Sequence, residues 1–252
     1  MKPIAKQIIR TDSGNVEYAL SGKGTPAVVL INGGSGPIEG WFKVFNEIAE
    51  HTTVIAYNRL GIGRSDKPTR PQHGDAILGS LRQLLKELNI KPPYILVGHS
   101  LGGLYANLYA RQYRNEISGV VLLDASHPLD VAINKTQGLF VRSINRGFKL
   151  FDSLFPSRKW NETGFVEDTV HQIAEAGPFP NIPLFVVSGG KKPPMMPDPI
   201  FRIRKDNQLD FVRLSSKSKH IIAYNSGHFP QLTEPAIVVQ AVQECIQMVH
   251  YS

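Results

Sequence analysis

A serine flanked by two glycines is the feature of this sequence that indicates chemistry most directly. Residues 98–102 read G-H-S-L-G, after an apolar run at 94–97 and before a helical pattern over 101–113. A turn this tight between a strand and a helix strains the serine backbone and projects the Ser100 hydroxyl into open space, as in a nucleophile elbow. Gly98 and Gly102 are expected because a Cβ at either position would clash with the neighbouring strand or helix. The N-terminus of that helix favours negative charge developing at the serine.

A serine hydroxyl is a poor nucleophile at neutral pH, so it needs a base within hydrogen-bond reach and a carboxylate that orients the base. His228 is the best candidate for the base because it lies in a glycine-containing loop after the last apolar run, residues 221–224. His99, beside the serine, is expected to pack or to line a pocket, and His127 is a weaker candidate for a residue of the site. The other histidines are expected to be surface or structural residues: His51, His73, His171, His220 and His250.

The elements that must position these side chains alternate along the chain, which predicts an α/β fold with a mostly parallel central sheet flanked by helices. A hairpin is predicted from residues 4–10 and 16–20, with its turn at 12–15. Short apolar runs of the fully buried type predict further strands at residues 27–31, 53–57, 94–97, 119–123, 184–187 and 221–224. Helical patterns cover residues 41–50, 77–88, 101–113 and 236–249.

The interval between the strand that ends near Asp124 and the strand that begins near Leu184 is too long for a simple crossover. We therefore predict a single domain over residues 1–252, with a helical lid at residues 128–182 inserted after strand six, over the carboxyl edge of the sheet. Some of its aromatic residues are expected to anchor the insertion to the core and others to line an apolar pocket. These residues are Phe140, Phe148, Phe151, Phe155, Trp160 and Phe165.

Four segments, in order along nearly the whole chain, resemble the α/β-hydrolase superfamily. Residues 30–36 resemble its oxyanion loop H-G-G-x-G, with Asn32 in place of the usual histidine. Residues 58–66 resemble its D-x-x-G-x-G-x-S-D stretch, with Asn58 in place of the usual aspartate. The third segment is the G-H-S-L-G-G elbow, and the fourth is S-G-H-F-P at 226–230 with the following Glu-Pro, which resembles the histidine loop and last helix. The resemblance implies an α/β-hydrolase fold with Ser100 as nucleophile and His228 as general base.

The resemblance also implies an oxyanion hole made of two backbone N–H groups. One belongs to Leu101, the residue after the nucleophile. The other belongs to the loop after the first parallel strand, where Gly34 is expected because glycine lets the backbone approach the substrate closely. Gly33 and Gly36 are expected to form a plain turn.

The acid of the triad is the least determined member. The superfamily's usual acid follows strand seven by a few residues, but residues 188–194 read S-G-G-K-K-P-P and contain no carboxylate. Asp124 is preferred, because a strand-six acid is a variant found in the superfamily and the order Ser100, Asp124, His228 follows Ser…Asp…His. The end of an inner strand is also a rigid place from which to hold an imidazole. Asp198 is the alternative, which requires its proline-rich loop to fold back, and Asp130 is a more distant one.

Composition and charge narrow the function classes. The net charge is +7, but the basic residues are dispersed and no nucleic-acid motif accompanies them. The single cysteine, Cys245, allows no intramolecular disulfide and is expected in the core. No signal-peptide core is present and no run approaches the roughly 20 apolar residues of a membrane span, so we expect a cytoplasmic protein without an integral membrane segment. The absence of metal-ligand spacings and nucleotide loops predicts neither a metal nor a cofactor.

Together these features predict a cofactor-free serine hydrolase of carboxylesterase type (EC 3.1.1). It would cleave a small or medium carboxylic ester, or a related acyl bond of a small-molecule substrate, through an acyl-enzyme on Ser100. The missing strand-seven acid leaves open a ligand-binding or signalling protein with vestigial hydrolysis, and a C–C hydrolase or lyase is a further alternative on the same scaffold. A serine nucleophile argues against the dehalogenase and epoxide-hydrolase branches, and Leu101, where prolyl aminopeptidases carry tryptophan, argues against a peptidase. The sequence specifies neither the acyl-chain preference nor the oligomeric state.

Overall fold

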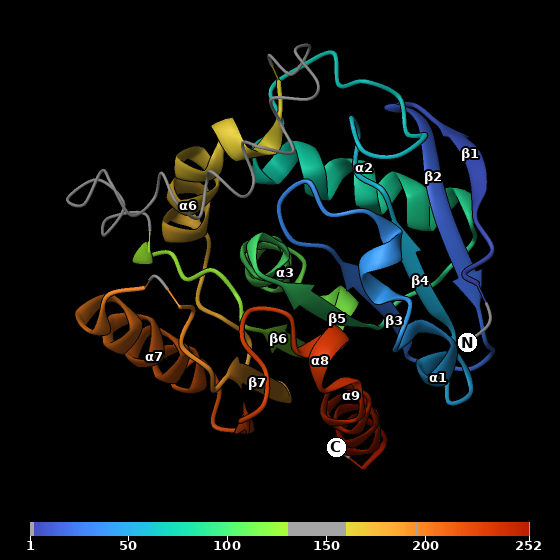
Figure 1. Cartoon of the computed structure of the whole chain (residues 1–252). Helices are drawn as coiled ribbons and strands as arrows, with labels where there is room; N and C mark the ends of the chain where they lie inside the picture. Colours follow the sequence, from blue (N-terminus) through green and yellow to red (C-terminus); the bar gives the residue numbers. More distant parts are fainter. Residues whose placement is uncertain (1–2, 131–159, 195, 252) are drawn as a thin grey trace.

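The computed structural model describes residues 3–130, 160–194 and 196–251, which form one eight-stranded sheet with helices on both faces (Figure 1). The strand order is β1-β2-β4-β3-β5-β6-β7-β8. β1 pairs antiparallel with β2, and β2 antiparallel with β4, whereas all pairs from β4 to β8 are parallel. The predicted fold class, a mostly parallel sheet flanked by helices, is therefore confirmed.

The strands are β1 (Gln7–Thr11), β2 (Gly14–Ser21), β3 (Ala27–Ile31), β4 (Val54–Tyr57), β5 (Tyr94–His99), β6 (Ile117–Leu123), β7 (Leu184–Gly189) and β8 (Ser218–Ala223). The α-helices are α1 (Phe45–Ala49), α2 (Gly74–Glu87), α3 (Leu101–Gln112), α6 (Val166–Glu175), α7 (Asp198–Val212), α8 (Pro230–Thr233) and α9 (Pro235–His250). Three short 3₁₀ helices complete the described part: η1 (Ile38–Trp41), η2 (Arg114–Glu116) and η3 (Glu162–Gly164).

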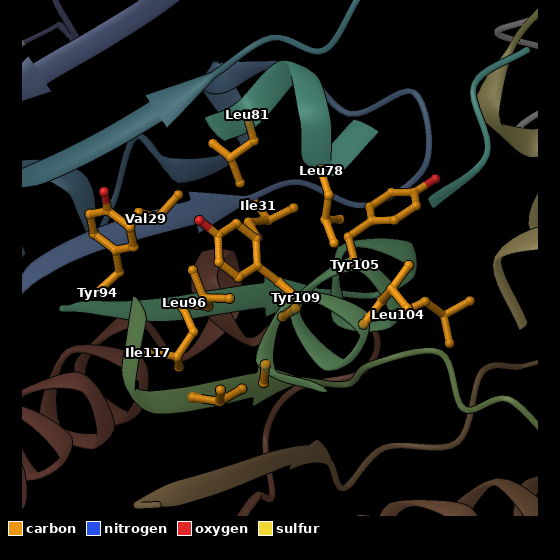
Figure 2. Close-up of a cluster of buried hydrophobic side chains, with 14 of the residues drawn as sticks. Val29, Ile31, Leu78, Leu81, Tyr94, Leu96, Leu104, Tyr105, Tyr109 and Ile117 are labelled. Atoms are coloured by element: carbon orange, nitrogen blue, oxygen red, sulfur yellow. The ribbon is translucent and has the colours of Figure 1, made fainter. Parts of the chain in front are cut away.

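The central strands are apolar along their whole length because both faces of the sheet are covered. Successive side chains of β3 point to opposite faces, so Val29 and Ile31 join one core while Val28 and Leu30 join the other. Figure 2 shows the first core, in which α2 and α3 pack on β3, β5 and β6. The second core lies between the sheet and helices α1 and α9. This double layer makes the carboxyl ends of the parallel strands a rigid platform for the loops that follow them.

The predicted helix over residues 41–50 is wrong as a single element. The chain forms η1 and the short α1 instead, separated by a turn at residues 42–44. Trp41, Val44 and Phe45 are all buried, which gave the segment an apolar helical pattern, but aromatic and β-branched residues have low intrinsic helix propensity.

Helix α7 was not predicted, because the prolines that precede it indicated a loop. Pro199 is the second residue of α7, and proline is well tolerated in the first turn, where its missing N–H would have no helical partner anyway. The predicted helices over residues 77–88, 101–113 and 236–249 are found as α2, α3 and α9.

Most of the predicted lid, residues 131–159, lies outside the described residues, and so do Phe140, Phe148, Phe151 and Phe155. The lid and its bounds therefore stay a prediction. The described end of the insertion carries η3 and α6, and α6 packs against α2 and α3. Trp160 stacks on Phe165 with ring centroids 6.4 Å apart. Nowhere in residues 3–130, 160–194 or 196–251 is there a helix both long and apolar enough to cross a bilayer.

Candidate active site

Ser100 lies between the end of β5 and the start of α3, with φ 51° and ψ −122°. This is a sparsely populated conformation for a residue with a side chain, as expected for a strained turn. The predicted reason for the two glycines is also confirmed: a Cβ on Gly98 would lie 2.6 Å from the Gly102 carbonyl oxygen, and one on Gly102 would lie 2.2 Å from that of Ile31. The serine N–H is held by the Leu123 carbonyl at 3.1 Å. The tight junction therefore anchors Ser100 between three elements of the core.

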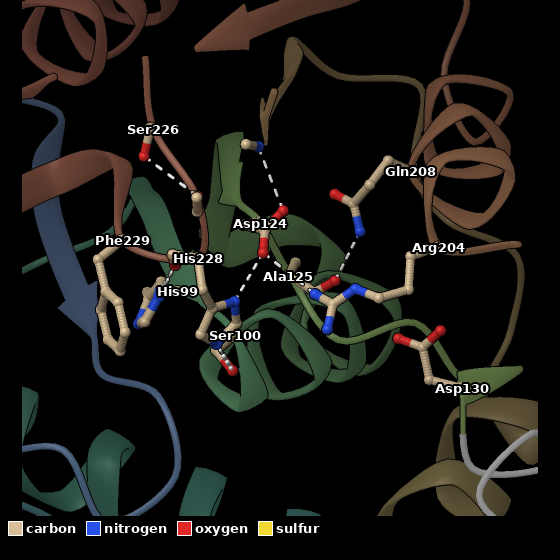
Figure 3. Close-up of polar contacts among 12 residues, drawn as sticks. His99, Ser100, Asp124, Ala125, Asp130, Arg204, Gln208, Ser226, His228 and Phe229 are labelled. Atoms are coloured by element: carbon tan, nitrogen blue, oxygen red, sulfur yellow. Dashed lines mark hydrogen bonds and ion pairs between the residues drawn. The ribbon is translucent and has the colours of Figure 1, made fainter. Parts of the chain in front are cut away.

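Three residues distant in sequence form a continuous hydrogen-bonded row at the carboxyl edge of the sheet (Figure 3). The Ser100 Oγ lies 2.9 Å from His228 Nε2, and His228 Nδ1 lies 2.6 Å from Asp124 Oδ2. Because an ionised carboxylate only accepts, Nδ1–H donates to Asp124 and Nε2 is free to accept from the serine hydroxyl. The structure thus brings together the three residues that sequence reasoning had placed in one site.

Asp124 is held from several directions. Its Oδ1 accepts the Gly189 N–H at 3.2 Å, and its Oδ2 lies 3.1 Å from Nη2 of Arg204 on α7 as well as near His228. Figure 3 shows Arg204 and His228 approaching the carboxylate from different sides. Burial alone would raise the pKa of Asp124, but the hydrogen bond and charge of His228, with Arg204, outweigh it and lower that pKa to about 2. Asp124 is therefore a carboxylate at neutral pH.

His99 supports His228 from behind. Its Nε2–H donates to the His228 carbonyl oxygen at 2.7 Å, and the two rings lie 4.9 Å apart. Burial, reinforced by the neighbouring His228, lowers the pKa of His99 to about 3. His99 is therefore a neutral, buried donor that fixes the backbone of His228, which agrees with the packing role expected for it.

The loop that contains Gly33 and Gly34 lies against the elbow. A Cβ on Gly33 would be 3.2 Å from Ser100 Cβ, and one on Gly34 would be 3.3 Å from Leu101 Cδ2. Gly36 N–H bonds the Gly33 carbonyl at 3.1 Å, so the expected plain turn is present there. Gly34 therefore lies beside Leu101, and their pairing as oxyanion donors stays a prediction.

An arginine that sequence reasoning did not single out holds this loop in place. The Arg59 guanidinium donates to the carbonyl oxygens of Asn32 at 2.9 Å and Gly33 at 2.6 Å, and it forms an ion pair with Glu162 of η3. Glu162 Oε1 also accepts the Ser35 N–H at 2.8 Å. Burial lowers the pKa of Arg59, but the Glu162 carboxylate outweighs this effect, so the net shift is upward. We call this arrangement of Arg59 and Glu162 the loop clamp.

The alternative acids and the alternative histidine have other partners. Asp198 begins α7, is 73% exposed in its side chain and pairs with Lys192. Asp130 accepts from the His127 N–H at 2.8 Å and from Asn207 at 2.6 Å. His127 itself packs edge-on against Phe211, with Nε2 3.2 Å from Asp210 Oδ2. None of these contacts includes His228.

The two departures from the family pattern differ in their side-chain contacts: the Asn58 amide is hydrogen-bonded, whereas Asn32 Nδ2 is buried with no hydrogen-bond partner among the described residues. Asn58, in place of the usual aspartate, donates to Glu17 at 2.6 Å and accepts the Ile38 N–H at 2.8 Å. Asn32, in place of the usual histidine, is buried, and the loop clamp holds its backbone carbonyl oxygen, not its side chain. Within the described residues, no cluster of three histidine, cysteine or acidic side chains could hold a metal ion.

Comparisons with known proteins agree with this architecture. The sequence profile of the alpha/beta hydrolase fold matches residues 26–171. Uncharacterized protein YqjL of Bacillus subtilis (strain 168) is 27% identical over 236 residues, which cover 88% of this chain and 85% of that protein. A 2-hydroxy-6-oxo-6-(2'-aminophenyl)hexa-2,4-dienoic acid hydrolase of Metapseudomonas resinovorans is 30% identical over 165 residues, covering 58% of this chain and 57% of that protein. A thermophilic esterase from Thermogutta terrifontis has a similar structure, with a TM-score of 0.68 and 22% identity over 98% of this chain and 99% of that one.

Proposed function

Because the chain belongs to the alpha/beta hydrolase fold family, we propose that it is a serine hydrolase that cleaves a small or medium carboxylic ester through an acyl-enzyme. The observation that carries the proposal is the row from Ser100 Oγ through His228 to Asp124, with distances of 2.9 Å and 2.6 Å. A serine, a histidine in the correct tautomer and an ionised carboxylate in this order are the parts that nucleophilic acyl transfer needs.

In the proposed mechanism, His228 Nε2 takes the hydroxyl proton as Ser100 Oγ attacks the ester carbonyl carbon. Asp124 keeps Nδ1 protonated and stabilises the imidazolium that forms. The oxyanion accepts hydrogen bonds from the N–H groups of Leu101 and Gly34, at the N-terminus of α3. The imidazolium then gives its proton to the leaving alcohol, and an acyl-enzyme on Ser100 remains. A water molecule deprotonated by His228 releases the carboxylic acid and restores the serine.

An ester is the first choice because acyl transfer to a serine is the simplest reaction that the row can perform, and an esterase of known structure shares the fold. A second reaction, hydrolysis of a carbon–carbon bond in a vinylogous diketone acid, is favoured by one observation, the likeness to the Metapseudomonas hydrolase. Both reactions would use Ser100, His228 and Asp124. A panel of p-nitrophenyl esters alongside a 2-hydroxy-6-oxo-dienoate substrate separates them, because only the second substrate loses its conjugated absorbance on C–C cleavage.

The test of the proposal compares wild type with Ser100→Ala on p-nitrophenyl acetate and butyrate, together with labelling by a fluorophosphonate. We expect turnover and labelling in wild type and neither in Ser100→Ala. Ser80→Ala on α2, where the hydroxyl bonds the Ala76 carbonyl, serves as the matched control and should keep both. Turnover that persists in Ser100→Ala would contradict the proposed nucleophile. If the wild type shows no turnover on any substrate of the panel and no labelling, the ligand-binding alternative is favoured.

A further inference from the structure

A pocket of about 180 Å³ opens behind the Asp124–His228 pair, between α7 and the ends of β7 and β8. Asp124 and His228 line it, but Ser100 does not. Asp124 bonds His228 Nδ1, whereas Ser100 bonds Nε2 on the other side of the ring. The pocket therefore reaches the triad from its acid side and is separate from the place where an ester carbonyl would meet the serine.

Part of the wall of this rear pocket is apolar. Met196 and Ile222 come from the loop after β7 and from β8, and Phe201 and Leu209 come from α7. Leu209 is 47% exposed although it is apolar, so a ligand in the pocket would remove apolar surface from water. The volume is smaller than the roughly 300–1,000 Å³ of pockets for larger ligands and close to the roughly 150 Å³ of an engineered cavity that holds benzene. The size fits one ring or a chain of about six carbons.

The charges around the pocket are mainly positive. Lys191, Arg204 and Lys205 line it, against the single carboxylate of Asp124, which already accepts from Arg204, His228 and Gly189. Lys191 belongs to the stretch after β7 that lacks the acid usual in the superfamily, so a cation lines the pocket close to the usual position of that carboxylate.

Asp124 uses only one nitrogen of the Arg204 guanidinium. Among the described residues, the one partner of that guanidinium is Asp124, through Nη2 at 3.1 Å. The guanidinium has five N–H donors and its side chain is 21% exposed. Lys205 lies over the Phe201 ring, with Nζ 5.2 Å from the centroid, which keeps its ammonium beside the apolar wall. A planar anion could therefore be held by Arg204 while its hydrocarbon part contacts the walls.

We propose that the rear pocket binds a small amphipathic carboxylate, an aliphatic acid of about six carbons or a single-ring aromatic acid. The carboxylate bonds Arg204 with support from Lys191 and Lys205, and the hydrocarbon part packs between α7 and β8. This site goes beyond the proposed function, since it requires no turnover at Ser100. A bound anion would share Arg204 with Asp124, so occupancy is coupled to the electrostatics of the triad.

The test is a calorimetric titration of the whole chain with hexanoate and phenylacetate, with 1-hexanol and hexylamine as neutral and cationic controls. We expect saturable binding of the two acids and much weaker binding of both controls. Arg204→Gln should weaken acid binding about tenfold or more, as expected for a hydrogen-bonded charge contact. Lys205→Gln should weaken it about twofold to fivefold, since that charge is more exposed.

Two further variants locate the bound acid. Ile222→Trp fills the rear pocket and should abolish acid binding, and unchanged unfolding temperature shows that the variant folds. Leu101→Ala alters the Ser100 side of the triad and should leave acid binding unchanged. The inference is overturned if 1-hexanol binds as tightly as hexanoate, if the acids do not bind to wild type, or if Leu101→Ala weakens acid binding while Ile222→Trp and Arg204→Gln do not.

Discussion

Two arginine–carboxylate pairs lie on either side of the proposed triad, and they are built differently. In the loop clamp, Arg59 and Glu162 are 3% and 4% exposed, and the guanidinium bonds both carboxylate oxygens and two backbone carbonyls. In the other pair, Arg204 and Asp124 are 21% and 13% exposed, and a single nitrogen meets a single oxygen. The first pair is buried in the protein, whereas the second lines the rear pocket.

Because their surroundings differ, we expect one ion pair to serve folding and the other to serve the proposed chemistry. A fully buried pair contributes mainly through the large cost of removing one partner, because the other charge is then left unpaired in a low-dielectric interior. A partly exposed pair that shares its carboxylate with a histidine adds little to folding. It can still adjust how strongly that carboxylate holds the imidazole. We therefore expect changes to the loop clamp to act mainly on stability and changes at Asp124 to act mainly on rate.

The largest expected effect is that of Asp124→Asn on kcat. The amide can donate to His228 Nδ1 and so favours the tautomer that cannot accept from Ser100, and kcat should fall about 10⁴-fold, as in other triads. Asp198→Asn is the matched control and should change kcat less than about threefold, because an exposed surface pair contributes little. Ester hydrolysis under saturating substrate measures both. Similar, mild losses in the two variants would remove Asp124 from the triad and with it the contrast between the two pairs.

The next effect is that of Glu162→Gln on stability. The change leaves Arg59 charged and buried without a counter-ion, and the free energy of unfolding should fall by about 3 kcal/mol. Glu175→Gln, at the exposed end of α6, is the control and should change it by less than about 0.5 kcal/mol. Urea unfolding followed by circular dichroism measures both values. If the free energy of unfolding of Glu162→Gln equals that of wild type, the loop clamp contributes no more to stability than an exposed surface ion pair does.

Ser100 and His228 of the proposed triad could be predicted from local sequence, and Asp124 could be named as the preferred acid. The strand and helix that bracket Ser100 are strong apolar and helical patterns, and two glycines specify the turn. His228 lies in the loop after β8, the last parallel strand, and Asp124 comes directly after β6. Once the strands lie in parallel order, their carboxyl ends meet at one edge, so residues that follow them come together.

The partners of these residues could not be predicted, because they come from elements whose positions depend on tertiary packing. Arg204 lies on α7, a helix that was not predicted because the prolines before it indicated a loop. Nothing in the local sequence of Arg204 indicates a contact with Asp124. Glu162 comes from the insertion after β6, and only the folded loop brings it to Arg59. The choice between Asp124 and Asp198 was open for the same reason, since it depends on the path of the chain after β7.

The smallest effect separates the two pairs by their pH dependence. A carboxylate with a lowered pKa contributes stability that is present above its unfolded value and lost as the pH falls through its folded value. For Asp124 the folded pKa is about 2, against 3.8 for the free side chain, so its contribution of about 2 kcal/mol is lost between about pH 4 and about pH 2. Arg204→Gln removes one of several groups that lower this pKa, and should cost about 0.5–1 kcal/mol at pH 6 and less than half of that at about pH 2. Arg202→Gln, an exposed arginine on the same helix, is the control, and urea unfolding at the two pH values measures the difference. An Arg204→Gln deficit of equal size at both pH values would mean that Arg204 acts through packing, as a structural residue of α7, and not through the charge of Asp124.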